Sequence, residues 1–74
     1  SFPIYPSSTG HIMQVGNLYT SQAHGLILLH KVLPTQRTTN GSMLYKVVFQ
    51  VVVGGSRKHT YITRDGFHER FTSL

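Results

Sequence analysis

The clearest hydrophobic pattern in the chain covers residues 43–53. Every odd-numbered position in this segment is apolar, whereas the even-numbered positions include Lys46 and Gln50. A period of two, combined with many β-branched residues, predicts a β-strand that buries one whole face. Gly54 and Gly55 follow at once and predict a turn.

A second apolar segment, residues 25–33, is bounded by Gly25 and Pro34. Leucine favours helices, but a short run with no N-cap and no polar face fits a buried strand better. We expect Pro34 to end this strand, because proline cannot donate a hydrogen bond to a sheet. Residues 34–42 are polar and contain the turn dipeptide Asn40-Gly41, so they predict a loop.

Shorter segments complete the set of expected elements. Residues 18–21 and 59–63 are β-prone, and residues 11–15 are a further candidate for a short strand. Residues 64–66 predict a turn, and the form of residues 67–74 is left open. Together these segments indicate four to five short strands joined by tight turns, with little or no helix.

These elements predict an all-β fold. A flat three-stranded sheet would leave one apolar face in water, whereas a small barrel buries that face and removes most open edges. We therefore expect a small SH3-like or partly open five-stranded barrel formed by residues 11–74. Residues 1–10 contain Pro3 and Pro6 and predict an extended N-terminal arm. A chain of 74 residues has no room for a second core.

The charge balance is the first indication of function. The chain has seven Lys and Arg residues but only two acidic residues, Asp65 and Glu69, which gives a formal net charge of +5. A cation of this density attracts polyanions, meaning nucleic acid, an anionic membrane surface or an acidic protein. The alternative is that the charge only keeps a small protein soluble.

Composition disfavours several other classes of protein. The chain has no cysteine, so it has neither a disulfide framework nor a thiolate metal site. His24 and His30 are six positions apart and His59 and His68 are nine apart, which match no recognised ligand spacing, so no metal or cofactor is expected. The apolar runs fall far short of the roughly 18 residues of a membrane span, and no signal peptide is visible, so we expect a cytoplasmic location without a membrane partner.

Basic and aromatic residues are interleaved over eight consecutive positions, which contain Arg57, Lys58, His59, Tyr61 and Arg64. Phosphates need cations and bases need flat faces, so this mixture is typical of single-strand or backbone binding. Along a strand, His59 and Tyr61 point to the same face. The alternative is that Tyr61 belongs to the core and that Arg57 and Lys58 are ordinary solubilising residues of a turn.

Two further regions extend this candidate interface. Lys46 and Gln50 fall on the outer face of the strand at residues 43–53. Arg37 lies in the expected polar loop, where it either contacts phosphate or a groove or is simply solvated. The predicted nucleic-acid-binding residues are therefore Arg37, Lys46, Arg57, Lys58, His59, Tyr61 and Arg64.

A ribonuclease is the enzymatic alternative. A metal-free ribonuclease uses one histidine as general base and another as general acid, with cations to stabilise the charged phosphorane. The residues available for these roles are His59, His68, Arg57 and Lys58. Carboxylate chemistry is disfavoured, because Asp65 sits in an expected glycine turn where its side chain bonds the backbone. No Gly-rich phosphate loop or nucleophile elbow is present, and we expect no enzymatic activity.

A pattern of glycine and aromatic residues spans about two-thirds of the chain. It consists of Gly16 and Tyr19, His24 and Gly25 before a strand, Tyr45 and Phe49 within one, Gly54 and Gly55, and residues 63–66. This pattern resembles a small β domain common in bacteriophage proteins, including the segment ahead of the HNH nuclease domain in some homing endonucleases. The resemblance implies an SH3-like barrel that assists nucleic-acid binding. Residues 34–42 are longer than the compact hairpin of that domain, and without HNH nuclease residues no nuclease activity is implied.

The favoured function is a small, basic, non-enzymatic module that binds DNA or RNA, phage-encoded by the resemblance and then located in the host cytoplasm. The alternative is a protein-interaction module, such as a virus-encoded inhibitor of a host protein or a structural accessory. It would use an apolar patch or a β-edge, the latter also able to form a homodimer. Residues 47–53 would recruit another chain if they lay at an edge, although their two-sided apolar character favours a central position.

Overall fold

The computed structural model describes residues 13–74, so the expected N-terminal arm at residues 1–10 lies outside the described range. This range contains five strands and one helix. In chain order they are β1 (Leu18–Ser21), β2 (Gly25–Arg37), β3 (Met43–Val51), β4 (Arg57–Thr63), α2 (Arg64–Arg70) and β5 (Phe71–Ser73). The fold is all-β, as the hydrophobic pattern predicts.

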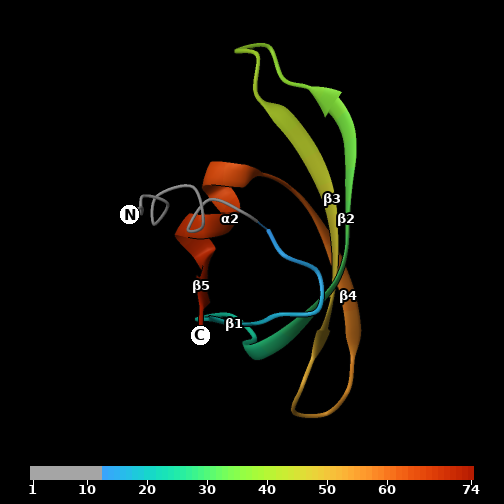
Figure 1. Cartoon of the computed structure of the whole chain (residues 1–74), viewed down its shortest axis with the longest axis vertical. Coiled ribbons are helices and arrows are strands. Elements are labelled where there is room, and N and C mark those ends of the chain that lie inside the picture. Colours follow the sequence, from blue (N-terminus) through green and yellow to red (C-terminus); the bar gives the residue numbers. More distant parts are fainter. Residues whose placement is uncertain (1–12) are drawn as a thin grey trace, which may run out of the picture.

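All five strands form one antiparallel sheet in the order β4-β3-β2-β1-β5. Strands β1 to β4 follow one another as a meander, and β5 returns to pair with β1. The sheet curls around α2, which lies on its concave side, and so forms a partly open barrel (Figure 1). β3 lies between β2 and β4, so the strand expected to be central is central.

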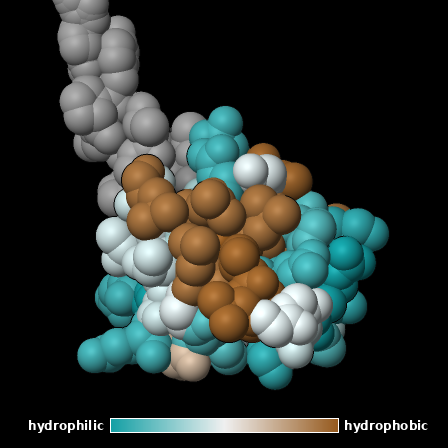
Figure 2. All heavy atoms as spheres, turned by 90° about the horizontal axis from the view of Figure 1, so that it is seen from below, coloured by the Kyte–Doolittle hydropathy of each residue, from teal (hydrophilic) through white to brown (hydrophobic). Residues whose placement is uncertain are grey.

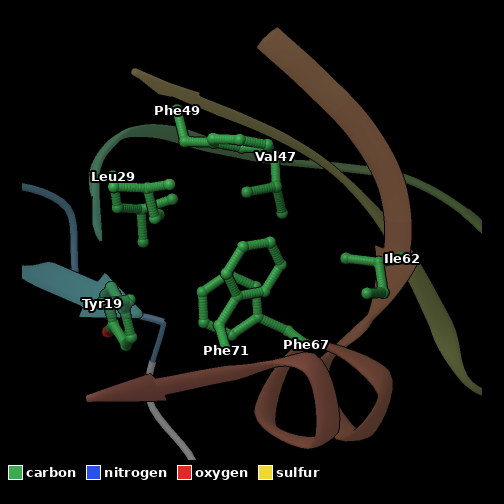
Figure 3. Packing of buried hydrophobic residues seen from close by; sticks show 8 residues of the cluster. Tyr19, Leu29, Val47, Phe49, Ile62, Phe67 and Phe71 are labelled. Atoms are coloured by element: carbon green, nitrogen blue, oxygen red, sulfur yellow. The ribbon is translucent and has the colours of Figure 1, made fainter. Parts of the chain in front are cut away.

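The core fills the space between the concave side of the sheet and the α2–β5 segment. Its buried hydrophobic members are Tyr19, Ile27, Leu29, Val47, Phe49, Ile62, Phe67 and Phe71. Phe67 of α2 stacks on Phe71 with 4.6 Å between ring centroids, and Tyr19 meets Phe67 edge-on at 5.1 Å. Figure 3 shows the two phenylalanine rings pointing from the helix side toward the strands that carry Val47 and Phe49. The helix therefore completes a core that the sheet alone leaves open.

The helix is the main departure from the sequence prediction, which placed a turn at residues 64–66. Thr63 caps α2, because its side-chain oxygen accepts a hydrogen bond from the backbone N of Gly66 at 3.2 Å. Asp65 lies in the first turn, where its negative charge suits the helix dipole. The segment therefore starts a helix, and that helix carries Phe67 into the core.

Strand β2 also differs from its prediction, since it passes through Pro34 and ends only at Arg37. β1 pairs with β2 no further than Leu28, so β2 has a neighbour on one side only at Pro34, where a missing N–H is tolerated. Beyond this point β2 and β3 continue as a hairpin past β1, with its turn projecting beyond the sheet (Figure 1), and the expected loop shrinks to residues 38–42. Residues 13–15, the described part of another expected strand, are not in a strand.

Candidate nucleic-acid interface

Strands β3 and β4 divide their side chains between the two faces of the sheet. Val47 and Phe49 of β3 and Ile62 of β4 are buried in the core. Because side chains alternate along a strand, the residues between them point outward, away from α2. We call the outward side of β2, β3 and β4 the outer face. Its basic and aromatic residues are His30, Lys31, Lys46, Arg57, His59 and Tyr61.

The register between strands places these residues in adjacent rows. Lys46 of β3 lies directly opposite Tyr61 of β4. In the next row, Val48 lies between Lys31 of β2 and His59 of β4. Directly opposed side chains in an antiparallel sheet have their Cβ atoms about 5 Å apart. Lys46 and Tyr61 are therefore immediate neighbours, and a single side chain separates Lys31 from His59.

His59 and Tyr61 present two rings side by side on β4. Their ring centroids are 6.1 Å apart and their planes are perpendicular. Tyr61 is 53% exposed, so the alternative that places it in the core is wrong. An exposed aromatic ring on a sheet offers a flat surface for a nucleobase. Arg57 begins the same strand, opposite Gln50, and is exposed.

The acidic side chains are confined to one side of the sheet. The chain has two carboxylate side chains, Asp65 and Glu69, and both belong to α2, on the concave side (Figure 1). The cations of the outer face, Lys31, Lys46 and Arg57, therefore share that face with no acidic residue. No acidic side chain on the outer face neutralises these three cations, which favours a polyanion there.

Sequence reasoning missed Lys31, because the register of β2 shifts between Leu29 and Lys31. Leu29 is buried, and the extra residue leaves both His30 and Lys31 on the outer face. The ring Nε2 of His30 makes a 3.0 Å hydrogen bond with Oε1 of Gln50, which ties it to β3 on that face. The signal in the sequence is a polar pair inside an apolar run, since a strand buried on both faces has no place for it.

Three of the predicted residues lie elsewhere. Lys58 points to the side of β4 opposite the outer face and lines a pocket of about 480 Å³. Arg37 and Arg64 line a second pocket, of about 330 Å³, between the turn end of the β2–β3 hairpin and the start of α2. Arg37 Nη1 donates to the carbonyl of Gly41 at 2.9 Å, which ties its side chain to the hairpin turn. The predicted residues that share the outer face are Lys46, Arg57, His59 and Tyr61.

One end of the molecule carries an apolar patch, seen in Figure 2 from below the view of Figure 1. Leu18 of β1 lies opposite Leu28 of β2, and the backbone N of Val52 donates to the carbonyl of Leu26. Leu18 and Val52 are 40% and 44% exposed. We call these four residues the apolar end. An exposed patch of this kind is the feature that the protein-interaction alternative requires.

The two histidines of the ribonuclease hypothesis lie on different elements. His59 is exposed on β4. His68 is half-buried on α2, with its ring centroid 5.4 Å from that of Phe67. His59 lines the larger pocket and His68 does not.

No protein-family model, curated protein or solved structure matches this chain significantly. The resemblance to the phage β domain therefore stays a prediction. Over residues 13–74, no three His, Asp or Glu side chains cluster in a way that could hold a metal ion. The same described range contains no helix with the length and apolar character needed to cross a membrane.

Proposed function

We propose that this protein is a non-enzymatic module that binds single-stranded nucleic acid, DNA or RNA, across the outer face. The observation that carries the proposal is the pairing of an exposed Tyr61 with Lys46 directly opposite, on a face without acidic residues. A base stacks on the tyrosine ring, while Lys31, Lys46 and Arg57 bind phosphates around it.

A single strand suits this face better than a duplex. Stacking on Tyr61 needs a base whose flat side is free, and the bases of a duplex are covered by their neighbours. Stacking on an aromatic side chain contributes about 1–3 kcal/mol per base and is available to every base. We therefore expect binding with little sequence preference and a strong dependence on salt.

The test is a titration of the protein into a fluorescent, unstructured oligonucleotide of about ten nucleotides, followed by anisotropy. Each cation that binds a phosphate of a single strand lowers the slope of log affinity against log salt concentration by about 0.7. The three cations of the outer face therefore predict a slope of about −2. The single strand is expected to bind more tightly than a duplex of equal length. Absence of binding at about 50 mM salt rejects the proposal.

The non-enzymatic part of the proposal has its own test. Prolonged incubation with RNA is expected to leave the RNA intact. Cleavage by the wild type that disappears in both His59→Ala and His68→Ala would establish the ribonuclease in its place, because those two residues are the general acid and base of that alternative.

The apolar end favours a second candidate function, a protein-interaction module. Its partner is either another protein or a second copy of this chain. Leu18 and Val52 are exposed there, and Leu28 lies opposite Leu18 on the neighbouring strand. If the apolar end holds two copies together, sedimentation equilibrium shows a dimer that Leu18→Gln dissociates. If the protein is monomeric at all accessible concentrations, the homodimer hypothesis is rejected.

A further inference from the structure

The larger pocket occupies the open seam of the barrel, between edge strand β4 and the segment formed by α2 and β5. Its lining comes from residues 21–24 at the β1–β2 turn, residues 58–60 of β4, residues 69–71 and the ring of Phe49. At about 480 Å³ it falls within the size range of small-molecule sites. Of the residues that line this pocket, His59 is the one that also belongs to the outer face.

His24 supplies a flat surface in this pocket. Its half-buried ring lies against Phe49, with 5.2 Å between centroids and 52° between planes. Phe49 in turn meets Phe71 at 5.5 Å, and both phenylalanines are buried. The backbone N of His24 donates to Ser21 Oγ at 2.9 Å, which fixes the turn that carries the ring. The imidazole thus rests against the core, and histidine is one of the side chains on which nucleobases stack.

The charged residues of the pocket suit a phosphate. Lys58 of β4 and Arg70 of α2 contribute a positive charge each, and Glu69 is the acid in the lining, so the pocket keeps one net positive charge. A phosphodiester with one negative charge balances it. Gln22 and Thr60 add amide and hydroxyl groups, which can hydrogen-bond the edge of a base.

The pocket is continuous with the outer face across β4. Arg57 and Lys58 are consecutive residues whose side chains point to opposite sides of the strand. His59 lies on the outer face and also contributes to the pocket lining. In the described sheet β4 has a neighbour on one side only, so a nucleic-acid strand can pass over its free edge from one surface to the other.

The geometry points to a nucleotide site in this pocket, with a base on His24 and its phosphate between Lys58 and Arg70. The inference rests on the proposed function in one respect, the source of the nucleotide. That source is the terminal nucleotide of a nucleic-acid strand bound on the outer face. A free nucleoside monophosphate offers the same base with a phosphomonoester, which carries about −1.5 to −2 at pH 7 where the diester carries one negative charge, so it serves as the probe.

The experiment follows amide chemical shifts of the labelled protein during titration with thymidine 5′-monophosphate. Shifts are expected at Ser21, His24 and Thr60. Deoxyribose 5-phosphate, which lacks the base, is expected to bind about fivefold more weakly or worse, because the stacking contact is lost. His24→Ala removes this difference, whereas His24→Phe, which keeps a flat ring, retains it.

A matched pair of variants tests the phosphate contact. Lys58→Gln is expected to weaken binding of the mononucleotide about fivefold, since one charge-assisted contact is lost. Arg37→Gln makes the same charge change in the smaller pocket, outside both the outer face and this pocket, and leaves this affinity unchanged. Pocket shifts that are absent at saturating nucleotide, or equal losses in the two variants, overturn the inference.

The two proposals fail in different ways. Oligonucleotide that does not bind the outer face, together with mononucleotide shifts that respond to Lys58→Gln, rejects the outer-face interface and supports the pocket. Oligonucleotide binding that responds to Arg57→Gln, without pocket shifts, rejects the pocket alone. An oligonucleotide whose terminal residue lacks its base is expected to bind more weakly than the intact one, and equal binding overturns the strand end as the source of the nucleotide.

Discussion

The two faces of β3 and β4 come from alternating residues of the same two segments, yet they meet different requirements. The inner face, with Val47 at 0% and Ile62 at 5% exposure, is what any small barrel needs in order to exclude water. The outer face needs only residues that tolerate solvent, and it instead presents an exposed Tyr61 opposite Lys46 with no acid nearby. Folding explains the alternation but does not explain this choice of outward residues. We infer that the inner face sets stability and the outer face sets binding, and substitutions should separate the two.

The largest expected effect is on the inner side. Phe67 is fully buried and contacts the rings of Tyr19 and Phe71, so Phe67→Ala should cost about 3–5 kcal/mol of unfolding free energy. That is a large part of the stability of so small a domain. Urea unfolding followed by circular dichroism measures the loss. A midpoint close to that of the wild type would show that the helix does not complete the core.

On the outer side, Tyr61→Ala should lower affinity for a single-stranded oligonucleotide about 5- to 150-fold, because the stacking surface is lost. The ring is 53% exposed, so the unfolding free energy should change by no more than about 0.5 kcal/mol. Tyr61→Phe, which keeps the ring, is the control and should bind nearly as well as the wild type. Equal anisotropy curves for the alanine variant and the wild type would remove Tyr61 from the interface.

A smaller effect on stability alone is expected at the helix cap. Thr63→Ala removes the oxygen that accepts from the backbone N of Gly66, at a cost of about 1 kcal/mol. The melting temperature should fall by about 4–8 °C, and Thr63→Ser should restore most of it. Oligonucleotide affinity below the melting transition should not change. An affinity loss in the fully folded variant would mean that the two sides of the sheet are coupled.

The smallest expected effect concerns Lys31, the cation that the sequence did not reveal. Lys31→Gln should reduce affinity about three- to fivefold at low salt and make the salt slope shallower by about 0.7. Anisotropy titrations at several salt concentrations measure both changes. An unchanged slope would confine the interface to β3 and β4.

The sequence determines which residues of β3 and β4 point outward, but not how the strands align. Period two places Lys46 and Tyr61 on outward positions of their strands whatever the register. The alignment depends on where the connecting turn is centred. Gly54 and Gly55 as a two-residue turn would oppose Lys46 to Thr63, whereas the observed turn begins at Val52 and opposes it to Tyr61. That difference arises from packing, which local sequence does not encode.

Other parts of the site depend on irregular backbone or on distant contacts. Lys31 reaches the outer face because of a register shift in β2, which no simple alternation predicts. Lys58 and Arg64 are close in sequence to Tyr61 but lie away from it, one across β4 and the other at the start of α2. Closeness along the chain therefore did not decide which side of the sheet each of these side chains occupies. The helix was missed because Thr63 and Gly66 fit a turn as well as a helix start.

Two double variants of equal net charge test the central claim most directly. Lys46→Gln with Arg57→Gln removes two cations from the outer face, and Arg37→Gln with Arg64→Gln removes two from the smaller pocket, so each lowers the formal charge from +5 to +3. Anisotropy at about 50 mM salt should show a drop in oligonucleotide affinity of about tenfold or more for the first pair and little change for the second. Equal losses in the two would mean that overall charge, and not the outer face, binds nucleic acid.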